Sequence, residues 1–333
     1  MIRDFGTTSQ GKAVQQIMLS NDQLTVSLLT LGVALQDVRL QGVPHSLTVG
    51  SQTLPAYESD MQYSGTIMGP VANRIGGARA DIDGQAYRFG ANLNGRHTLH
   101  GGDTATHTKI WTIGKHSDTE SLFHLTLANG EGGFPGTRHL SARYQIIGAD
   151  LRLTLTAKTT APTLMNLANH SYWNLGPSPT TAGHHLTIKA DHYLPGDITD
   201  FLPTGEIADV TGTRFDYRNG RAVQAGAEGL IDNNFCLSNA RRPIRHVATL
   251  TGLTGVEMQI ATTEPGLQIF DGHILGLGSV SDMDGNTPQP YAGLAIEAQF
   301  WPDAPNNPAF PSIILRPNQS WQQITNWTFS VKD

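Results

Sequence analysis

The stretch "LRLTLTA" at residues 151–157 alternates apolar and polar side chains along its length. Successive side chains of a β-strand point to opposite faces of the sheet, so this alternation predicts a strand with one buried and one polar face. The same alternation recurs at Phe123, Leu125 and Leu127, at Leu186 and Ile188, and at Val256, Met258 and Ile260. Repeated strands with one buried face are typical of antiparallel sheets.

Turn signals and the near absence of helical periodicity indicate the same fold class. Asp83-Gly84 lies between two short strand-like runs in "ADIDGQAYRF" (80–89), which is a strong hairpin signal. Glycine and proline are spread evenly along the chain, so no linker stands out. We therefore predict an all-β protein, a large antiparallel β-sandwich with few short helices, formed as a single domain over residues 1–333. A division into two domains is the weaker alternative.

The composition restricts the partner and the compartment. With a net charge of −6 and 15% charged residues, the chain has no basic footprint for nucleic acid or an anionic membrane. Cys236 is the only cysteine, which excludes an intrachain disulfide and a cysteine-based zinc site. The first residues lack the apolar core of a signal peptide, and residues 24–35 are too short and polar to span a bilayer. We expect a cytoplasmic protein with a small, weakly charged partner.

Two short motifs resemble known sites but lack the residues that the chemistry requires. "GTTSQGKA" (6–13) matches a phosphate-binding loop except that Ala13 replaces the hydroxyl that would hold magnesium, and too few residues precede it for a buried strand. "SDMDGN" (281–286) superficially resembles the start of a calcium loop, but Gly285 falls at the fourth position of that loop instead of the sixth. The twelfth position is Gly293, where a calcium loop has a glutamate, so we predict a turn. The H-E-x-x-H spacing is missing as well, and we expect no metal and no cofactor.

Two histidines stand out by their neighbours. His100 in "HTLHGG" (97–102) precedes two glycines, where the backbone can turn sharply and a ligand can approach closely. His170 in "NHSYWNL" (169–175) is followed by Tyr172 and Trp173, flat faces that can pack on a sugar ring, and by Asn174 as a polar contact. A single histidine is more often a hydrogen-bonded structural residue, and the residues alone leave that alternative open.

Two carboxylates lie in apolar surroundings. Glu297 in "GLAIEAQFW" (293–301) and Asp232 in "LIDNNFCL" (230–237) would be buried charges that need a partner or a function. Asn73 and Arg74 in "VANRIGG" (71–77) supply hydrogen-bond donors at what resembles a strand end. Each carboxylate could form a structural ion pair, or face a histidine across a pocket and provide an acid and a base together.

These stretches together resemble the aldose 1-epimerases, and the similarity covers nearly the whole chain. It rests on "VANRIGG" (71–77), "TLHGG" (98–102), "HTKIW" (107–111), "NHSYWNL" (169–175), "LPTGEIADVTGTRFDYR" (202–218), "IDNNFCL" (231–237), "GLQIFDG" (266–272) and "IEAQFWPDAPNNPAFPSIILRPNQSW" (296–321). The resemblance implies a β-supersandwich that interconverts the α and β anomers of free hexoses without a cofactor.

The resemblance also implies roles for individual residues. Glu297 would be the general base and His170 the general acid, with His170 titrating near neutral pH. The residues that would hold the sugar are Asn73, Arg74, His100, Asp232 and Gln268. Two departures bear on the preferred sugar, namely Pro70 in place of an arginine common in the family and "FDGH" (270–273) in place of a tyrosine-containing turn.

Other functions remain as alternatives. A carbohydrate-binding protein on the same fold would need the pocket without the acid and base, and a hexose-phosphate 1-epimerase would need additional cations beside the pocket. A glycosidase with paired carboxylates fits the histidine-rich motifs poorly. The preferred aldose, the choice between a monomer and a homodimer, and the choice of His170 or His100 as proton donor to the ring oxygen are left open.

Overall fold

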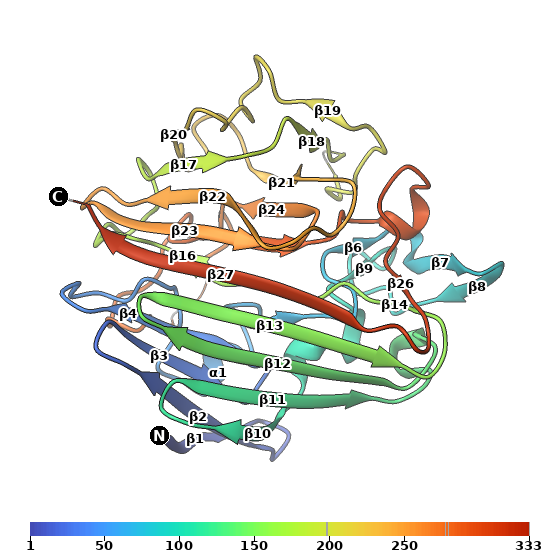
Figure 1. Ribbon diagram of the computed structural model, residues 1–333, viewed down its shortest axis with the longest axis horizontal. Coiled ribbons are helices and arrows are strands. Elements are labelled where there is room, and N and C mark those ends of the chain that lie inside the picture. The colour runs from blue at the N-terminus through green and yellow to red at the C-terminus, as the bar shows by residue number, and fades with distance from the viewer. Residues whose placement is uncertain (198, 277, 279, 333) are drawn as a thin grey trace.

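The computed structural model describes residues 1–333 except 198, 277, 279 and 333, and this part of the chain is almost entirely β-structure (Figure 1). The α-helical content of the described residues is α1 (Leu54–Tyr57), accompanied by the short 3-10 segments η1 (Gly76–Ala78), η2 (Gly102–Thr104), η3 (Thr106–Thr108), η4 (Glu131–Gly133) and η5 (Ala304–Asn306). The prediction of an antiparallel β-sandwich with few short helices is confirmed.

A nine-stranded antiparallel sheet forms the largest layer and includes the opening stretch of sequence. Its strand order is β10 (Thr112–His116), β11 (Glu120–Leu127), β12 (Arg138–Ile147), β13 (Asp150–Thr159), β27 (Trp321–Val331), β23 (Val256–Thr262), β22 (Arg245–Thr251), β17 (His185–Ile188) and β20 (Arg221–Ala222). Figure 1 shows β11, β12, β13 and β27 as long neighbouring arrows. Leu151, Leu153 and Leu155 on β13 are buried while the residues between them are partly exposed, as the alternation predicts.

Two smaller sheets complete the main layers. A six-stranded sheet has the order β16 (Tyr172–Trp173), β25 (Leu294–Gln299), β24 (Gly266–Phe270), β21 (Asp232–Cys236), β18 (His192–Leu194) and β19 (Ala208–Asp209). A four-stranded sheet contains β1 (Ile2–Thr7), β2 (Ala13–Ser20), β3 (Leu24–Leu29) and β4 (Leu35–Leu40). All six residues of β25 are buried, because this strand is covered on both faces.

Four further two-stranded sheets accompany these layers in the described residues. They are β5 (Ile67–Met68) with β15 (Ala168–Asn169), β6 (Arg74–Ile75) with β9 (Thr98–Leu99), β7 (Arg79–Ile82) with β8 (Gln85–Arg88), and β14 (Thr163–Leu164) with β26 (Ile314–Leu315). Asp83 and Gly84 join β7 to β8 with φ angles of 57° and 81°, the positive values that a tight two-residue hairpin turn requires. The predicted hairpin is therefore confirmed.

The main core lies between the sheets and contains Trp173. Its ring centroid is 5.5 Å from that of Trp327 and 5.8 Å from that of Phe329, and its side chain is fully buried. Tyr172, the preceding residue on β16, points to the other face of its sheet because side chains alternate along a strand. The sequence offered both rings as sugar-packing faces, but Trp173 belongs to the core.

Both short motifs that lacked key residues form ordinary loops. The amide of Ser9 donates to both carboxylate oxygens of Glu58, at 2.9 and 3.1 Å, so an internal carboxylate lies where the loop could otherwise receive an anion. Asp282 accepts the amides of Asp284 and Asn286, which closes the predicted turn. Among the described residues, no helix is long and apolar enough to cross a membrane.

Candidate active site

A cavity of about 220 Å³ collects most of the residues that the sequence singled out. Arg74 comes from β6, Asp232 from β21 and Glu297 from β25, while His170 lies in the connection between β15 and β16. The cavity is lined by Tyr63, Asn73, Arg74, Leu93, Leu99, His100, His170, Tyr172, Phe201, Asp232, Phe270, His273, Ile274 and Glu297. Six of the eight predicted site residues, from five separate parts of the chain, therefore face one space.

His170 and Glu297 form a close pair at the buried end of the cavity. Nε2 of His170 is 3.5 Å from Oε1 of Glu297, and the two side chains are 5% and 2% exposed. The second carboxylate oxygen of Glu297, Oε2, has no hydrogen-bond partner among the described residues. A buried acceptor without a partner is costly to a protein, which makes it a candidate contact for a bound ligand.

Burial shifts the pKa values of this pair in opposite directions. It raises the pKa of Glu297 well above its ordinary value, and the nearby negative charge of Asp232 raises it further. It lowers the pKa of His170 to about 4, with a smaller contribution from His107. We predicted a pKa near neutrality for His170, but the ring is too deeply buried for that. Both shifts favour the uncharged forms, a protonated Glu297 and a neutral His170.

Asp232 is held in place by two neighbours. Its Oδ2 accepts a hydrogen bond from Nη2 of Arg74 at 2.9 Å, and its Oδ1 accepts one from Nε2 of Gln268 at 2.5 Å. Gln268 pairs with Glu297 across β24 and β25 but does not itself line the cavity. Gln268 therefore holds Asp232 in place without lining the cavity, whereas Asp232 and Arg74 both line it.

Two hydrogen bonds join His100 and Asn73, one between their backbones and one from the Asn73 backbone to the His100 ring. The amide of His100 donates to the carbonyl of Asn73 at 2.8 Å, and the amide of Asn73 donates to Nδ1 of His100 at 3.1 Å. Since Nδ1 is an acceptor, the ring proton of His100 must lie on Nε2. Burial lowers the pKa of His100 well below its ordinary value, with His170, His107 and Arg74 adding to the effect. His100 is thus a neutral hydrogen-bond donor.

Several residues that line the cavity were missed by sequence reasoning. The ring of Tyr63 lies against three histidines, with centroid distances of 5.0 Å to His100, 5.2 Å to His107 and 5.9 Å to His170. Phe201 is placed 5.8 Å from the guanidinium of Arg74. Neither residue lies in a recognisable pattern, because each reaches the cavity only through the packing of distant loops.

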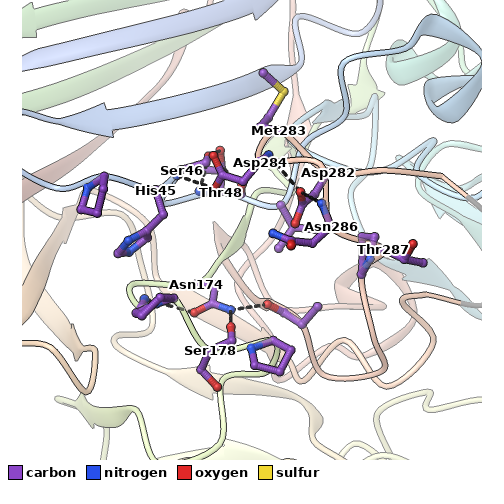
Figure 2. Close-up of a pocket in the computed structure, with 17 residues that line it drawn as sticks. His45, Ser46, Thr48, Asn174, Ser178, Asp282, Met283, Asp284, Asn286 and Thr287 are labelled. Carbon is purple, nitrogen blue, oxygen red and sulfur yellow. Dashed lines mark hydrogen bonds between the residues drawn. The ribbon is translucent and has the colours of Figure 1, made fainter.

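Asn174 is not brought to this cavity. Its Nδ2 donates to the carbonyls of Ser178 and Ala292, both at 2.9 Å, and its side chain lies with His45, Asp282 and others around a separate cavity of about 540 Å³ (Figure 2). The strand β16 ends at Trp173, so Asn174 already belongs to the loop that follows. Its bonds hold that loop in shape, and it is the one predicted site residue that the structure separates from the others.

The charge of the cavity is small. Arg74 is the only lysine or arginine among its described lining residues, and Asp232 neutralises it. Within the described residues, no group of three or more histidine, cysteine, aspartate or glutamate side chains is arranged to hold a metal ion. The donor set instead offers hydrogen-bond donors and acceptors together with the acid–base pair, which suits a neutral ligand rich in hydroxyl groups.

Comparisons with known proteins agree with this site. The sequence profile of aldose 1-epimerases matches residues 15–328. A galactose mutarotase from Rattus norvegicus is 35% identical over 332 residues, covering 97% of this chain and 96% of its own, and the protein named aldose 1-epimerase in Escherichia coli K12 is 30% identical, covering 93% of each. A crystal structure of an aldose epimerase homologue from C. elegans aligns with a TM-score of 0.88 at 30% identity, over 96% of this chain and 100% of that one. The chain therefore belongs to the aldose 1-epimerase family and is an isomerase.

Proposed function

We propose that this isomerase interconverts the α and β anomers of free, uncharged aldohexoses such as glucose or galactose. The observation that carries the proposal is the buried pair of His170 and Glu297, whose nearest atoms are 3.5 Å apart at the end of a polar cavity. Such a pair offers one proton donor and one proton acceptor to the same ligand. The names of the relatives, galactose mutarotase and aldose 1-epimerase, support the same reaction.

Ring opening requires two proton transfers at different atoms. A proton leaves the anomeric hydroxyl O1, and another proton is added to the ring oxygen O5 as the C1–O5 bond breaks. We assign Glu297 as the base toward O1 and His170 as the acid toward O5. Transfers of this kind typically contribute about 100- to 10,000-fold each to the rate.

The proton count of the resting pair is already sufficient for this chemistry. Burial favours a protonated Glu297 beside a neutral His170, because it raises the pKa of the carboxyl and lowers that of the ring. Moving a proton from the Glu297 carboxyl to Nε2 of His170, groups whose nearest atoms are 3.5 Å apart, produces the carboxylate and the imidazolium that the reaction needs. Sugar hydroxyls around Glu297 would favour this charged form, because they can donate hydrogen bonds to the carboxylate.

Ring closure returns the site to its starting state. After rotation about the C1–C2 bond, O5 attacks the other face of the aldehyde, His170 takes the proton from O5, and Glu297 returns one to O1. No proton is gained or lost in a complete turnover. The reaction therefore needs no cofactor and no net exchange with solvent.

The remaining polar residues would hold the sugar in the reactive position. Asp232, fixed by Arg74 and Gln268, can accept hydrogen bonds from ring hydroxyls. His100 can donate from Nε2, and Arg74 can stabilise negative charge that develops on the oxygens during ring opening. The role of donor to O5 is assigned to His170 over His100, because the Nδ1 of His100 is already engaged by a backbone amide and its ring cannot take a second proton there.

Two alternatives are less consistent with the cavity. A protein that only binds sugar would gain nothing from a buried glutamate with an unpartnered oxygen, which is costly to fold. A hexose-phosphate epimerase needs cations beside the pocket, and Arg74 is the only lysine or arginine among the described lining residues.

We further propose that residues 1–333 form a single domain that acts in the cytoplasm on free sugar, as a monomer or a homodimer.

Polarimetry tests the proposed reaction directly. The protein should accelerate the change in optical rotation of freshly dissolved α-D-glucose or α-D-galactose, and should act more slowly on glucose 6-phosphate. Calorimetric titration of the same sugars, carried out in parallel, measures binding. Sugar binding without faster anomerisation would favour a binding protein, and the highest kcat/KM for glucose 6-phosphate would favour the phosphate epimerase.

A further inference from the structure

We propose that His273 is a further substrate-binding residue, oriented by Asp271, which accepts a hydrogen bond from a sugar hydroxyl remote from O1 and O5. The inference rests on the proposed function, since it concerns how the same cavity selects among aldoses. His273 and Asp271 lie in the turn that directly follows β24 (Gly266–Phe270).

Asp271 fixes the orientation of the His273 ring. Its carboxylate is almost fully buried, and its Oδ1 accepts hydrogen bonds from both Nδ1 and the backbone amide of His273, at 2.8 and 3.2 Å. Its Oδ2 accepts the amide of Ile231 at 2.9 Å, which ties the turn to the start of β21 next to Asp232. A carboxylate surrounded by donors has no proton to give, so Nδ1 of His273 must carry the ring proton.

The opposite edge of the ring is consequently an acceptor. With the ring proton on Nδ1, Nε2 of the imidazole has a lone pair that can accept a hydrogen bond. Among the described residues, none forms a hydrogen bond with this nitrogen. The His273 side chain lines the cavity and is 22% exposed, in contrast to the nearly inaccessible His170 and Glu297. His273 is therefore the more accessible part of the cavity lining, and its acceptor is available to a ligand.

The surroundings of His273 make this acceptor distinctive. Its ring centroid is 5.1 Å from that of Phe270, which in turn is 6.5 Å from that of His170. The cavity also has an apolar part to its lining, which consists of Leu93, Leu99, Phe201, Phe270 and Ile274. Ile274 is 49% exposed, which marks the mouth of the cavity. A sugar with O1 and O5 at the buried pair would present another hydroxyl to the mouth, where His273 offers a polar contact.

The chemistry of the dyad favours a neutral hydroxyl over an anionic substituent. The carboxylate of Asp271 is bonded to the Nδ1 edge of the ring, and its negative charge would repel a phosphate at the Nε2 edge. A hydroxyl donor, in contrast, matches the lone pair of Nε2. A site that hydrogen-bonds a substrate hydroxyl discriminates against the analogue that lacks it, because the protein acceptor is then left unpaired. His273 thus provides a means of selecting among aldoses.

Substitutions at position 273 separate this role from a purely structural one. In His273→Asn the amide nitrogen can replace Nδ1 and keep the bond to Asp271, but the side chain no longer reaches the position of Nε2. In His273→Gln the longer side chain restores a polar group near that position. His139→Gln is the matched control, because His139 is exposed on β12, away from the cavity.

Steady-state polarimetry of these variants with the parent hexose and with its 2-, 3-, 4- and 6-deoxy analogues tests the proposal. For the parent sugar, His273→Asn should raise KM by roughly 3- to 10-fold, the range of a single neutral hydrogen bond, and affect kcat less. His273→Gln should recover part of that loss, and the control should match the wild type. For one deoxy analogue the Asn substitution should change KM little, because the bond is already absent.

Two results would overturn the proposal. One is an equal change in KM for every analogue, which indicates a structural role, and the other is no change for any of them. If His273→Asn lowers the melting temperature strongly, the same contact is tested by comparing the KM values of His273→Gln and of the wild type across the analogue series. Dissociation constants measured calorimetrically test His273 even if anomerisation is not accelerated, so this proposal and the proposed function can fail separately.

Discussion

Nε2 of His170 lies 3.5 Å from Oε1 of Glu297, and both side chains are almost completely removed from solvent. Glu297 is buried because it lies on β25, whose residues from Leu294 to Gln299 are all covered. The low dielectric of such a site penalises the charged forms of both groups, which raises the pKa of Glu297 and lowers that of His170. The proposed acid and base are therefore closely coupled, and the mechanism treats them as one unit.

Removal of either member of the pair should nearly abolish catalysis. Glu297→Gln removes the proposed base and His170→Asn removes the proposed acid, so each variant should lower kcat/KM by about 100- to 10,000-fold, the range for general acid–base groups. Polarimetric relaxation of pure α-D-glucose or α-D-galactose measures the effect. Circular dichroism should show that both variants retain the fold.

The corresponding substitution at His100 decides which histidine gives its proton to O5. We expect His100→Asn to weaken binding and retain more activity than His170→Asn, because the Nδ1 of His100 is bonded to the amide of Asn73. Loss of activity in His100→Asn with wild-type rates in His170→Asn would transfer the acid role to His100. Wild-type rates in Glu297→Gln would contradict the assignment of the base.

The pH profile of kcat/KM should have an unusually low acidic limb. The proposed mechanism requires one proton on the pair, and a second proton would bind to His170, whose pKa is lowered to about 4. The rate should therefore persist down to about pH 5 and fall toward pH 4, while the loss on the alkaline side follows the raised pKa of Glu297. Rates extrapolated to zero buffer concentration remove the buffer-catalysed reaction. An acidic limb near the ordinary histidine value of about 6.5 would show that His170 titrates as an exposed group.

Asp232 should influence both binding and the alkaline limb. Its charge raises the pKa of Glu297, so in Asp232→Asn that pKa should fall and the alkaline limb should move to lower pH. The loss of the ion pair with Arg74 should also raise KM by about 10- to 100-fold, as expected for a charge-assisted hydrogen-bond network. Asp216→Asn is a suitable control, because Asp216 pairs with Arg218 at 2.8 Å outside the cavity. An unchanged alkaline limb in Asp232→Asn would contradict the coupling.

The fold was predictable because its cause is local. Leu151, Leu153 and Leu155 alternate with polar residues, and only a strand places all three on one buried face. Asp83-Gly84 likewise specifies its own turn, since both residues tolerate positive φ. The order of the strands in the sheets follows from contacts between distant segments, such as β13 with β27, and no short pattern encodes those contacts.

The site was predictable only in part, for a related reason. Residues such as Glu297 and Asp232 could be singled out because a carboxylate in an apolar stretch needs a partner. Tyr63 and Phe201 carry no such signal, and they reach the cavity only when separate loops pack together. Asn174 was misplaced because it directly follows β16, where the chain turns into a loop and directs the side chain to Ser178 and Ala292.

His184 provides a prediction about stability that is independent of catalysis. Its ring is fully buried, its Nε2 accepts the amide of Leu175 at 3.0 Å, and burial lowers its pKa to about 4. Between this value and the unfolded value of about 6.5, the unfolded chain binds a proton that the native ring excludes. The wild type should therefore lose stability as the pH falls through this range, by up to about 3 kcal/mol from this residue.

The effect of His184 can be isolated by comparison with a variant that does not titrate. We expect the free energy of unfolding of the wild type, minus that of His184→Gln, to increase from pH 4 to about pH 6.5 and then to level off. Urea denaturation at a series of pH values measures this difference. The subtraction cancels the contributions that other groups make to the pH dependence of stability. These groups are the other buried histidines and the carboxylates with raised pKa values, such as Glu297, whose contribution has the opposite sign to that of His184. A difference that does not depend on pH would mean that the His184 ring is protonated equally in the folded and unfolded chains, contrary to the burial that the fold imposes on it.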